Sequence, residues 1–368
     1  MTKNIRYIRA AASDADVTFF AGANTAAGFA SFYPEIFDES ALLRLYLIKG
    51  GPGSGKSTLL RRLVAAAKNA RLSTEAYLCG SDPLSLDAAV IRGEGGTVAA
   101  IDATSPHAYD ARYPGAAAAL FDPGAFWDAS ALRSHREAIT ALADAKGEAY
   151  RRAYRYLAAL GSVRRDLRRL GEDALDLMKM RAACRRYALS LAKGGVGDEA
   201  PTAAVRCASC VSMRGEAALD AAPGYATVSV TDTADVSAAF FGVMRDELSA
   251  AGIGSVRLCD CVEPELTAGL LIPSRGVRIV AADYGIGERN FNMARFLRRD
   301  RLAETKNRRA FARKCAATLL DGAVNALADA GEAHFALEDI YVAAMDFDAL
   351  TAASDRLIAE AVALAEGR

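Results

Sequence analysis

A glycine-rich segment at residues 50–58, GGPGSGKST, carries the clearest chemistry in the chain. The phosphate-loop pattern G-x-x-x-x-G-K-S/T is met by Gly50, Gly55, Lys56 and Ser57. In this pattern successive backbone N–H groups point inward and cradle phosphate oxygens. The lysine would reach the β- and γ-phosphates, and the serine hydroxyl would complete the coordination of Mg²⁺. The segment therefore predicts a binding site for the phosphates of a nucleotide.

The remaining residues of the segment suit the same role. Gly51 and Gly53 allow the backbone to curl without a side chain in the way, and Pro52 stiffens the loop. A helix beginning near Lys56 would add its dipole, worth about 0.3–1 kcal/mol when exposed. We expect the nucleotide to contact the whole segment, which comprises Gly50, Gly51, Pro52, Gly53, Ser54, Gly55, Lys56, Ser57 and Thr58.

The residues on either side of this loop predict its structural setting. Residues 43–49 are short and mainly apolar, as in a buried strand, and residues 58–67 have the periodicity of a helix. Strand, glycine loop and helix follow one another in the order that the motif requires. The sequence thus predicts an α/β fold of the P-loop NTPase type, a parallel sheet flanked by helices.

A second nucleotide signature ends at Asp102. Residues 98–101 are apolar, and an aspartate that follows such a strand holds Mg²⁺, usually through water. Ser57 and Asp102 are therefore the predicted metal-binding residues. Residue 103 is Ala, so the glutamate that many ATPases place here to activate water is missing.

Three polar residues near the predicted strand ends are further candidates. Asp82 follows a predicted strand at residues 74–79, where ligands gather in parallel sheets, but Asp82-Pro83 also suits a turn. Asp87 favours a turn or a helix cap. His107 could contact the γ-phosphate or a substrate, although a lone histidine is more often structural. The predicted catalytic residues are Lys56, Asp82, Asp102 and His107.

Composition limits the classes of partner. The 368 residues include 45 basic and 45 acidic side chains, so the zero net charge gives no indication of nucleic-acid or membrane binding. No apolar run is long enough to span a membrane, and the N-terminus lacks an apolar signal core. Seven scattered cysteines suggest reduced thiols in a cytoplasmic protein. The C-x-x-C at 207–210 and the C-x-C at 259–261 do not form a standard zinc spacing.

The chain also shows signs of internal duplication. Cys79, Pro83 and Asp102 have counterparts at Cys259, Pro264 and Asp283, at offsets of 180, 181 and 181. The loop expected in the second copy, residues 228–237, contains neither glycine nor lysine. We expect a P-loop domain at residues 1–195, with a helical hairpin at about 130–193 that breaks near Gly161. A linker at 194–201 would lead to a degenerate second domain with a helical tail at residues 202–368.

The motifs together resemble those of an uncharacterised bacterial family of tandem P-loop ATPases. The resemblance rests on IKGGPGSGKSTLL, CGSDPLSLD, IDATSPHAYD and the FWD at 126–128. It implies ATP as the nucleotide, residues 50–58 as the phosphate and Mg²⁺ residues, Asp102 in the second signature, and motif roles for Asp82 and His107. The family carries a phosphate loop in both halves, whereas the second loop here is degenerate.

These observations favour a Mg·ATP-binding protein with one working site, whose hydrolysis drives a conformational step. One alternative is a small-molecule kinase, in which Asp82 or His107 positions an acceptor hydroxyl. Another is a nucleotide-dependent switch that needs a protein partner to supply an arginine, worth about 10³–10⁵ in rate. No N-K-x-D-type segment for reading guanine is evident, which favours ATP over GTP.

Overall fold

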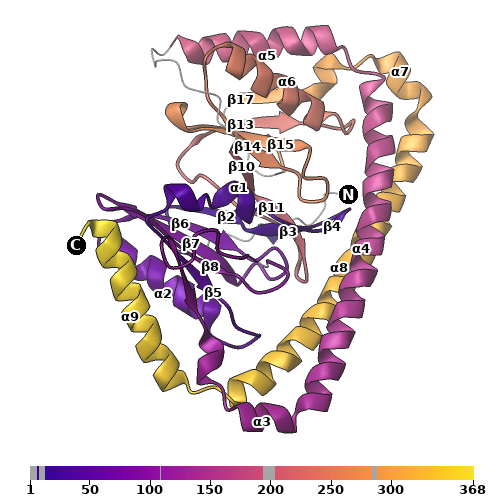
Figure 1. The fold of residues 1–368 in the computed structure, drawn as a ribbon. Helices are drawn as coiled ribbons and strands as arrows, with labels where there is room; N and C mark the ends of the chain where they lie inside the picture. The colour runs from indigo at the N-terminus through magenta and orange to yellow at the C-terminus, as the bar shows by residue number, and fades with distance from the viewer. Residues whose placement is uncertain (1–5, 8–12, 108, 194–203, 284–286, 288) are drawn as a thin grey trace.

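A twelve-stranded mixed sheet runs through the molecule, and its two halves repeat one strand order (Figure 1). The computed structural model describes residues 6–7, 13–107, 109–193, 204–283, 287 and 289–368. From the middle outward, the first half contains β2 (Val17–Phe20), β6 (Ser73–Leu78), β7 (Leu86–Gly93), β8 (Gly96–Asp102), β5 (Arg44–Ile48) and β9 (Ala118–Phe121). The second half contains β10 (Val205–Cys207), β14 (Val256–Cys259), β15 (Thr267–Ile272), β16 (Val277–Ala281), β13 (Ala226–Thr231) and β17 (Arg289–Asn292). Such a repeat is what a duplicated fold would produce.

The sheet is not wholly parallel, which corrects the sequence-based expectation. Within each half one strand, β7 or β15, runs antiparallel to its two neighbours. The reason is the length of the connections, because a parallel crossover needs a dozen residues or more. Only Glu94 and Gly95 join β7 to β8, and residues 79–85 join β6 to β7. The two halves also meet in an antiparallel pair, at Phe20 of β2 and Cys207 of β10.

A short β-hairpin from each half reaches the other half. β3 (Gly22–Thr25) pairs with β4 (Gly28–Ser31), and β11 (Ser209–Ser212) pairs with β12 (Gly215–Ala218), to which β1 (Arg6–Tyr7) adds. The N–H of Ala26, in the first hairpin, donates to the carbonyl of Val262 at 2.8 Å. The N–H of Met213, in the second, donates to the carbonyl of Ser81 at 3.1 Å. These reciprocal bonds join the two halves.

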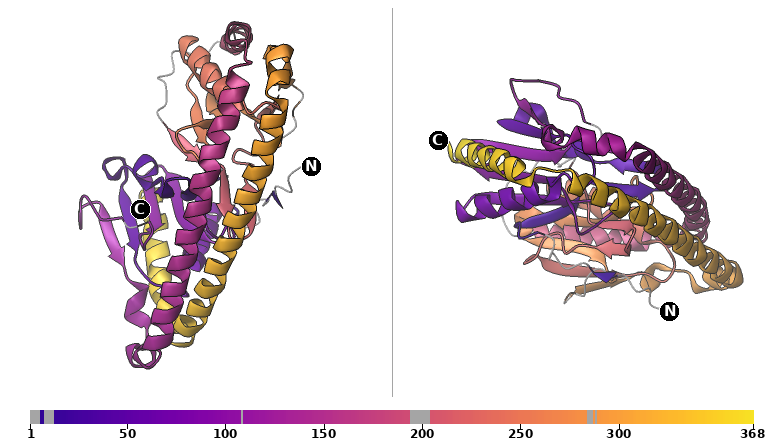
Figure 2. Two further views of the ribbon diagram at one scale, coloured as in Figure 1. Left: turned by 90° about the vertical axis from the view of Figure 1, so that its right-hand side faces the viewer. Right: turned by 90° about the horizontal axis from the view of Figure 1, so that it is seen from below.

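Helices cover the sheet and link its halves (Figures 1 and 2). Short helical turns lie at α1 (Tyr33–Ile36), η1 (Glu39–Ala41), η2 (Pro123–Phe126), η3 (Pro273–Arg275) and η4 (Met293–Phe296). The helices of the first half are α2 (Lys56–Asn69), α3 (Ala129–Ser134), α4 (Arg136–Glu172) and α5 (Leu177–Ala192). Their counterparts are α6 (Ser237–Ala250), α7 (Arg299–Glu304), α8 (Lys306–Ala343) and α9 (Phe347–Glu366). The long helices α4 and α8 run antiparallel and lie side by side along their length.

The last helix of each half packs on the other half. Met180 and Tyr187 of α5 join the core formed by α6 and the second half of the sheet. Leu357 and Ala361 of α9 join the core formed by α2 and the first half. The helical segments of residues 130–193 and of the tail therefore do not stay with the half that precedes them in sequence. The linker predicted at 194–201 lies outside the described residues.

The helical hairpin expected to break near Gly161 is instead one continuous helix, α4, paired with α8. Gly161 lies inside α4, and a Cβ placed on it would lie 2.8 Å from Cβ of Ala26. The glycine thus permits close approach of the first β-hairpin and does not end the helix.

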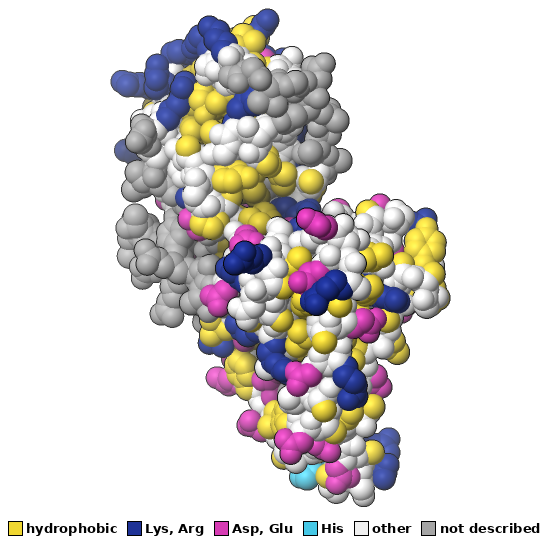
Figure 3. Space-filling view, turned by 90° about the vertical axis from the view of Figure 1, so that its left-hand side faces the viewer, with side chains coloured by type: hydrophobic (Ala, Val, Ile, Leu, Met, Phe, Trp, Pro, Cys, Tyr) yellow, Lys and Arg dark blue, Asp and Glu magenta, His cyan; other side chains and the backbone are white. Residues whose placement is uncertain are grey.

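In the described part of the chain, no helix is both long enough and apolar enough to cross a membrane. Figure 3 shows acidic and basic side chains interspersed over the lower part of the face that it displays.

Candidate nucleotide site

The glycine-rich loop connects β5 to α2, as the sequence predicts. β5 ends at Ile48 and α2 begins at Lys56. Gly53 and Gly55 adopt φ of 66° and 75°, the left-handed region that favours glycine. Ser54 is buried, and its hydroxyl donates to the carbonyl of Gly51 at 2.8 Å. The sharp loop therefore depends on glycine conformations as well as on hydrogen bonds within itself.

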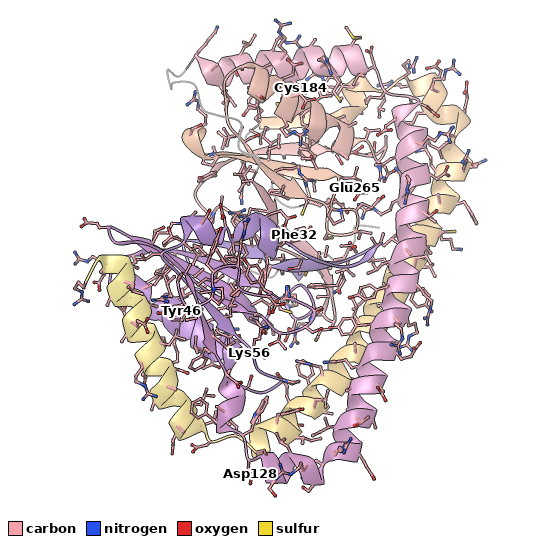
Figure 4. The ribbon with its side chains drawn as sticks, in the orientation of Figure 1. Phe32, Tyr46, Lys56, Asp128, Cys184 and Glu265 are labelled. Carbon is pink, nitrogen blue, oxygen red and sulfur yellow. The ribbon has the colours of Figure 1, made fainter. Side chains whose placement is uncertain are left out.

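Lys56 and Asp102 come together beside this loop. In the parallel pair of β5 and β8, Ile48 is in register with Asp102. Nζ of Lys56 lies 3.7 Å from Oδ2 of Asp102, and the two side chains are 13% and 16% exposed. Nζ also donates to the carbonyls of Gly50 at 2.6 Å and of Gly51 at 2.7 Å. The lysine thus folds back onto the loop that would hold phosphates (Figure 4).

Asp102 is positioned by Thr104. Its Oδ1 accepts the N–H of Thr104 at 2.9 Å, and the Thr104 hydroxyl donates to the carbonyl of Gly50 at 3.0 Å. Burial raises the pKa of the Asp102 carboxyl, Lys56 opposes that shift, and Asp87 adds to it, so the pKa lies above its ordinary value. A cation beside Asp102 would favour the charged form. Ala103 is buried, so the neighbouring position offers no carboxylate.

The structure adds Asp87 to this cluster, contrary to the turn or cap expected for it. Asp87 is the second residue of β7, and its side chain is buried. The preceding N–H, that of Leu86, donates to Oγ of Ser57 at 2.9 Å. Because β7 pairs with β8, Asp87 lies close enough to Asp102 for its charge to raise the pKa of the Asp102 carboxyl. Ser57 and Asp102 suit Mg²⁺, which takes few protein ligands and keeps its waters.

His107 does not reach the phosphate loop. It is 4% exposed and stacks on Tyr33, with ring centroids 4.8 Å apart. Its Nε2 lies 2.9 Å from Oδ2 of Asp87, although the two atoms are not aligned as a hydrogen bond. Its Nδ1 lies 3.4 Å from the hydroxyl of Ser31. His107 therefore packs beside the Asp87 carboxylate and is too enclosed to contact a phosphate directly.

Asp82 forms a turn and also joins the two halves. Its Oδ1 accepts the N–H of Leu84 at 3.2 Å, which is the turn that Asp-Pro favours. The same atom accepts from Nε of Arg214, in the hairpin of the second half, at 2.7 Å. Both contacts occupy the carboxylate. Thr58, the last residue of the predicted segment, is exposed on α2.

Residues from the end of α8 and the start of α9 cover the loop, and no sequence motif predicts that they do so. A Cβ on Gly51 would lie 3.1 Å from the ring of Trp127, which packs against Tyr341 with ring centroids 5.0 Å apart. A Cβ on Gly53 would lie 2.9 Å from the carbonyl oxygen of Glu338. The contacts of Tyr341 and Glu338 arise from the exchange of helices between halves, so no local pattern around residues 50–58 encodes them.

No protein-family model, curated protein or solved structure matches the chain. The resemblance to tandem P-loop ATPases therefore remains a prediction from the motifs. The functional argument depends on the geometry of the loop and of its neighbours.

The corresponding loop of the second half contains a carboxylate. Asp232 follows β13, and its side chain accepts the N–H groups of Ala234 at 2.8 Å, Val236 at 2.6 Å and Ser237 at 2.7 Å. Those last two groups lie at the start of α6, where a phosphate would bind in a working loop. Arg309 of α8 donates to the carbonyl of Thr233 at 2.7 Å. In the second half, a carboxylate of the loop itself thus accepts these N–H groups.

The cysteines do not form a metal site. All seven are unpaired, and Cys207, Cys210, Cys259 and Cys261 are buried. Burial raises the pKa of Cys261 to about 12, so its thiol stays protonated at neutral pH. Among the described residues, no group of three or more histidine, cysteine or acidic side chains is arranged to hold a metal ion.

A separate pocket lies in the second half, away from the phosphate loop. Its open volume is about 430 Å³, and the residues that line it are mainly apolar, including Leu258, Leu271 and Val280. Its one charged residue, Arg278, donates to the hydroxyl of Thr227 at 2.7 Å and pairs with Asp220. The pocket offers no convergent polar groups for catalysis.

Proposed function

We propose that the chain binds Mg·ATP at residues 50–58 and hydrolyses it to drive a conformational step, as a P-loop NTPase with one working site. The observation that carries the proposal is the placement of Lys56 beside Asp102. Asp102 ends β8, and the glycine loop that leads to Lys56 follows the neighbouring parallel strand β5. A phosphate-binding lysine and a magnesium-binding carboxylate need this proximity, because the metal bridges the phosphates that the lysine holds.

The residues would divide the work as follows. The N–H groups of the loop and of the start of α2 would bind the phosphates. Lys56 would release the carbonyls of Gly50 and Gly51 and pair with the phosphates instead. Ser57 and Asp102 would hold Mg²⁺, which supplies charge stabilisation to the transferring phosphoryl group. Seven unpaired cysteines support the proposal that this reaction takes place in the reducing cytoplasm.

The moving parts would be the helices that cover the loop. The end of α8 and the start of α9 contact Gly51, Gly53 and Gly55 directly. A nucleotide that changes the loop would therefore shift α8 against α4, and α4 extends to the second half. Hydrolysis would alter how the two halves are linked.

A small-molecule kinase is the second candidate, and Ala103 favours it. A kinase needs no water-activating carboxylate at that position, whereas many hydrolases place one there. In this case the acceptor would be a hydroxyl positioned near the buried Asp87, and not by His107 or Asp82, whose contacts are described above. A switch that turns over only with a protein partner is the third candidate.

One assay separates these candidates. Purified protein is incubated with Mg·ATP, and ADP and free phosphate are quantified together, beside the Lys56→Ala variant. Equal yields of both products, lost in the variant, would support the intrinsic ATPase. ADP without free phosphate, formed only when added cell extract supplies an acceptor hydroxyl, would identify a kinase. ATP-dependent thermal stabilisation without products would mean that an acceptor or a protein partner is missing, and cell extract would then be added to find the fraction that restores ADP formation. The absence of both stabilisation and products would overturn nucleotide binding.

A further inference from the structure

One face of α4 points toward the strand ends of the first half. Tyr154 donates from its hydroxyl to Oδ1 of Asn24 at 3.1 Å, and Tyr150, one turn earlier, stacks on Tyr154 with centroids 6.1 Å apart. Residues four apart share a helix face, so Lys146 continues this stripe by one more turn. It is the only lysine of α4, and its side chain is partly buried. The stripe therefore ends in an ammonium group on the face of α4 that contacts the first half.

Two charged groups bracket the end of this stripe. The helices α4 and α8 run antiparallel, and Arg152 of α4 pairs with Asp329 of α8, so Lys146 lies opposite the part of α8 that contains Glu338. The charges of Glu338 and of Lys56 both act on Lys146. Burial and the positive charge of Lys56 lower the pKa of Lys146, and Glu338 opposes that shift. A cation beside another cation is unfavourable unless an anion lies between them. A polyphosphate on the loop would be such an anion.

Glu338 brings a carboxylate to the loop from the helical side. Its backbone contacts Gly53, and its Oε1 lies 3.6 Å from Nε2 of His334 one turn earlier. His334 lowers the pKa of the Glu338 carboxyl, and the N–H of Gly53 and the charge of Lys56 lower it further. Partial burial raises this pKa, but the other causes outweigh it. Glu338 is thus ionised at neutral pH, next to a loop built for anions.

The second half shows that this fold accepts a carboxylate in such a place. There Asp232 satisfies the N–H groups at the start of α6 permanently, because it belongs to the loop itself. In the first half the carboxylate belongs to another element, α8, which can move. A phosphate group would repel Glu338 and take over its electrostatic role.

We propose that Lys146 is a positioning residue for the terminal phosphate of the nucleotide, and that Glu338 is the counter-charge that it exchanges for that phosphate. The inference rests on the proposed function and extends it. Lys146 belongs to α4 and Glu338 to α8, so the exchange ties the presence of the γ-phosphate to the packing of the two long helices. ADP, which lacks that phosphate, would leave Glu338 as the negative charge that acts on Lys146.

The test is the affinity for ATP and for ADP, measured by calorimetry with Mg²⁺ on the full chain. In Lys146→Met, ATP should bind about tenfold more weakly while ADP changes by less than about threefold, since one charge-assisted contact is lost only with ATP. Lys146→Arg should restore the preference. In Glu338→Gln, ATP should bind more tightly than in the wild-type protein, because a repelling charge is removed.

Lys314→Met is the matched control, because Lys314 is exposed on the long helix α8. Far-ultraviolet circular dichroism would confirm that each variant folds. Equal weakening of ATP and ADP in Lys146→Met, no weakening at all, or weaker ATP binding in Glu338→Gln would each overturn the inference and leave the proposed function intact. A wild-type protein that binds neither nucleotide would overturn both.

Discussion

Nζ of Lys56 lies 3.7 Å from Oδ2 of Asp102, although the two residues come from different strand–loop units. The direct pairing of β5 with β8 creates this proximity. Thr104 fixes it further, because it contacts both the carboxylate of Asp102 and the carbonyl of Gly50. The site is therefore assembled by the sheet, and the sheet is repeated in the second half with a different loop.

Removing the Asp102 carboxylate should separate binding from turnover. In Asp102→Ala, Lys56 and the loop remain, so part of the ATP affinity should persist. Mg²⁺-dependent ADP formation should fall by about 10–100-fold, as expected for a residue that orients a metal. Product formation is measured against Mg²⁺ concentration, and Asp110→Ala, whose side chain is 95% exposed, is the control. Full turnover in Asp102→Ala would contradict the assigned role.

Gly53 should be needed for two reasons that can be measured apart. Its φ of 66° would strain an alanine by about 1–2 kcal/mol, and the Cβ would lie 2.9 Å from the carbonyl oxygen of Glu338. Gly115 has φ of 77° but nothing within 4 Å of its Cβ position. Gly53→Ala should therefore lower the free energy of unfolding more than Gly115→Ala does. Equal losses in chemical denaturation would show that α8 does not restrain the loop.

An ion pair between α4 and the second half should make stability depend on pH. Burial alone would raise the pKa of Asp260, but Arg164, at 2.7 Å, and the N–H groups of Glu263 and Val262 outweigh it, so the pKa lies below the ordinary 3.8. The folded state then binds this proton less readily than the unfolded state. The stabilisation is complete above about pH 4 and declines as the pH falls toward the lowered pKa.

Arg164→Met should reverse the sign of that pH dependence. Asp260 would stay buried without its partner, which costs about 1–3 kcal/mol at neutral pH and less in acid, where the carboxyl is protonated. Urea unfolding at several pH values measures both effects. Arg151→Met, in which the lost side chain is 65% exposed, should change stability by less than about 1 kcal/mol. A pH profile identical to that of the wild-type protein would rule out the Asp260 contribution.

The sequence predicted those parts of the site that lie within one strand–loop unit. The loop at residues 50–58 and Asp102 follow local patterns, because each stands directly after a buried strand. The turn or cap predicted at Asp87 is wrong, because Asp87 lies in β7, whose connections are too short for a parallel crossover, and periodicity alone does not show this. Glu338 reaches the loop through the exchange of helices, and only tertiary packing brings it there.

The degenerate loop of the second half should depend on Asp232 for stability and not for nucleotide binding. Its carboxylate accepts three N–H groups, and loss of such a cap costs about 0.5–2 kcal/mol. Asp232→Ala should lower the free energy of unfolding by that amount and leave the ATP affinity unchanged. Asp283→Ala is the control, because Asp283 is exposed and its removal should cost less than about 0.5 kcal/mol. If Asp232→Ala acquired a second nucleotide per chain, the second half would instead be a working loop held closed by its own carboxylate.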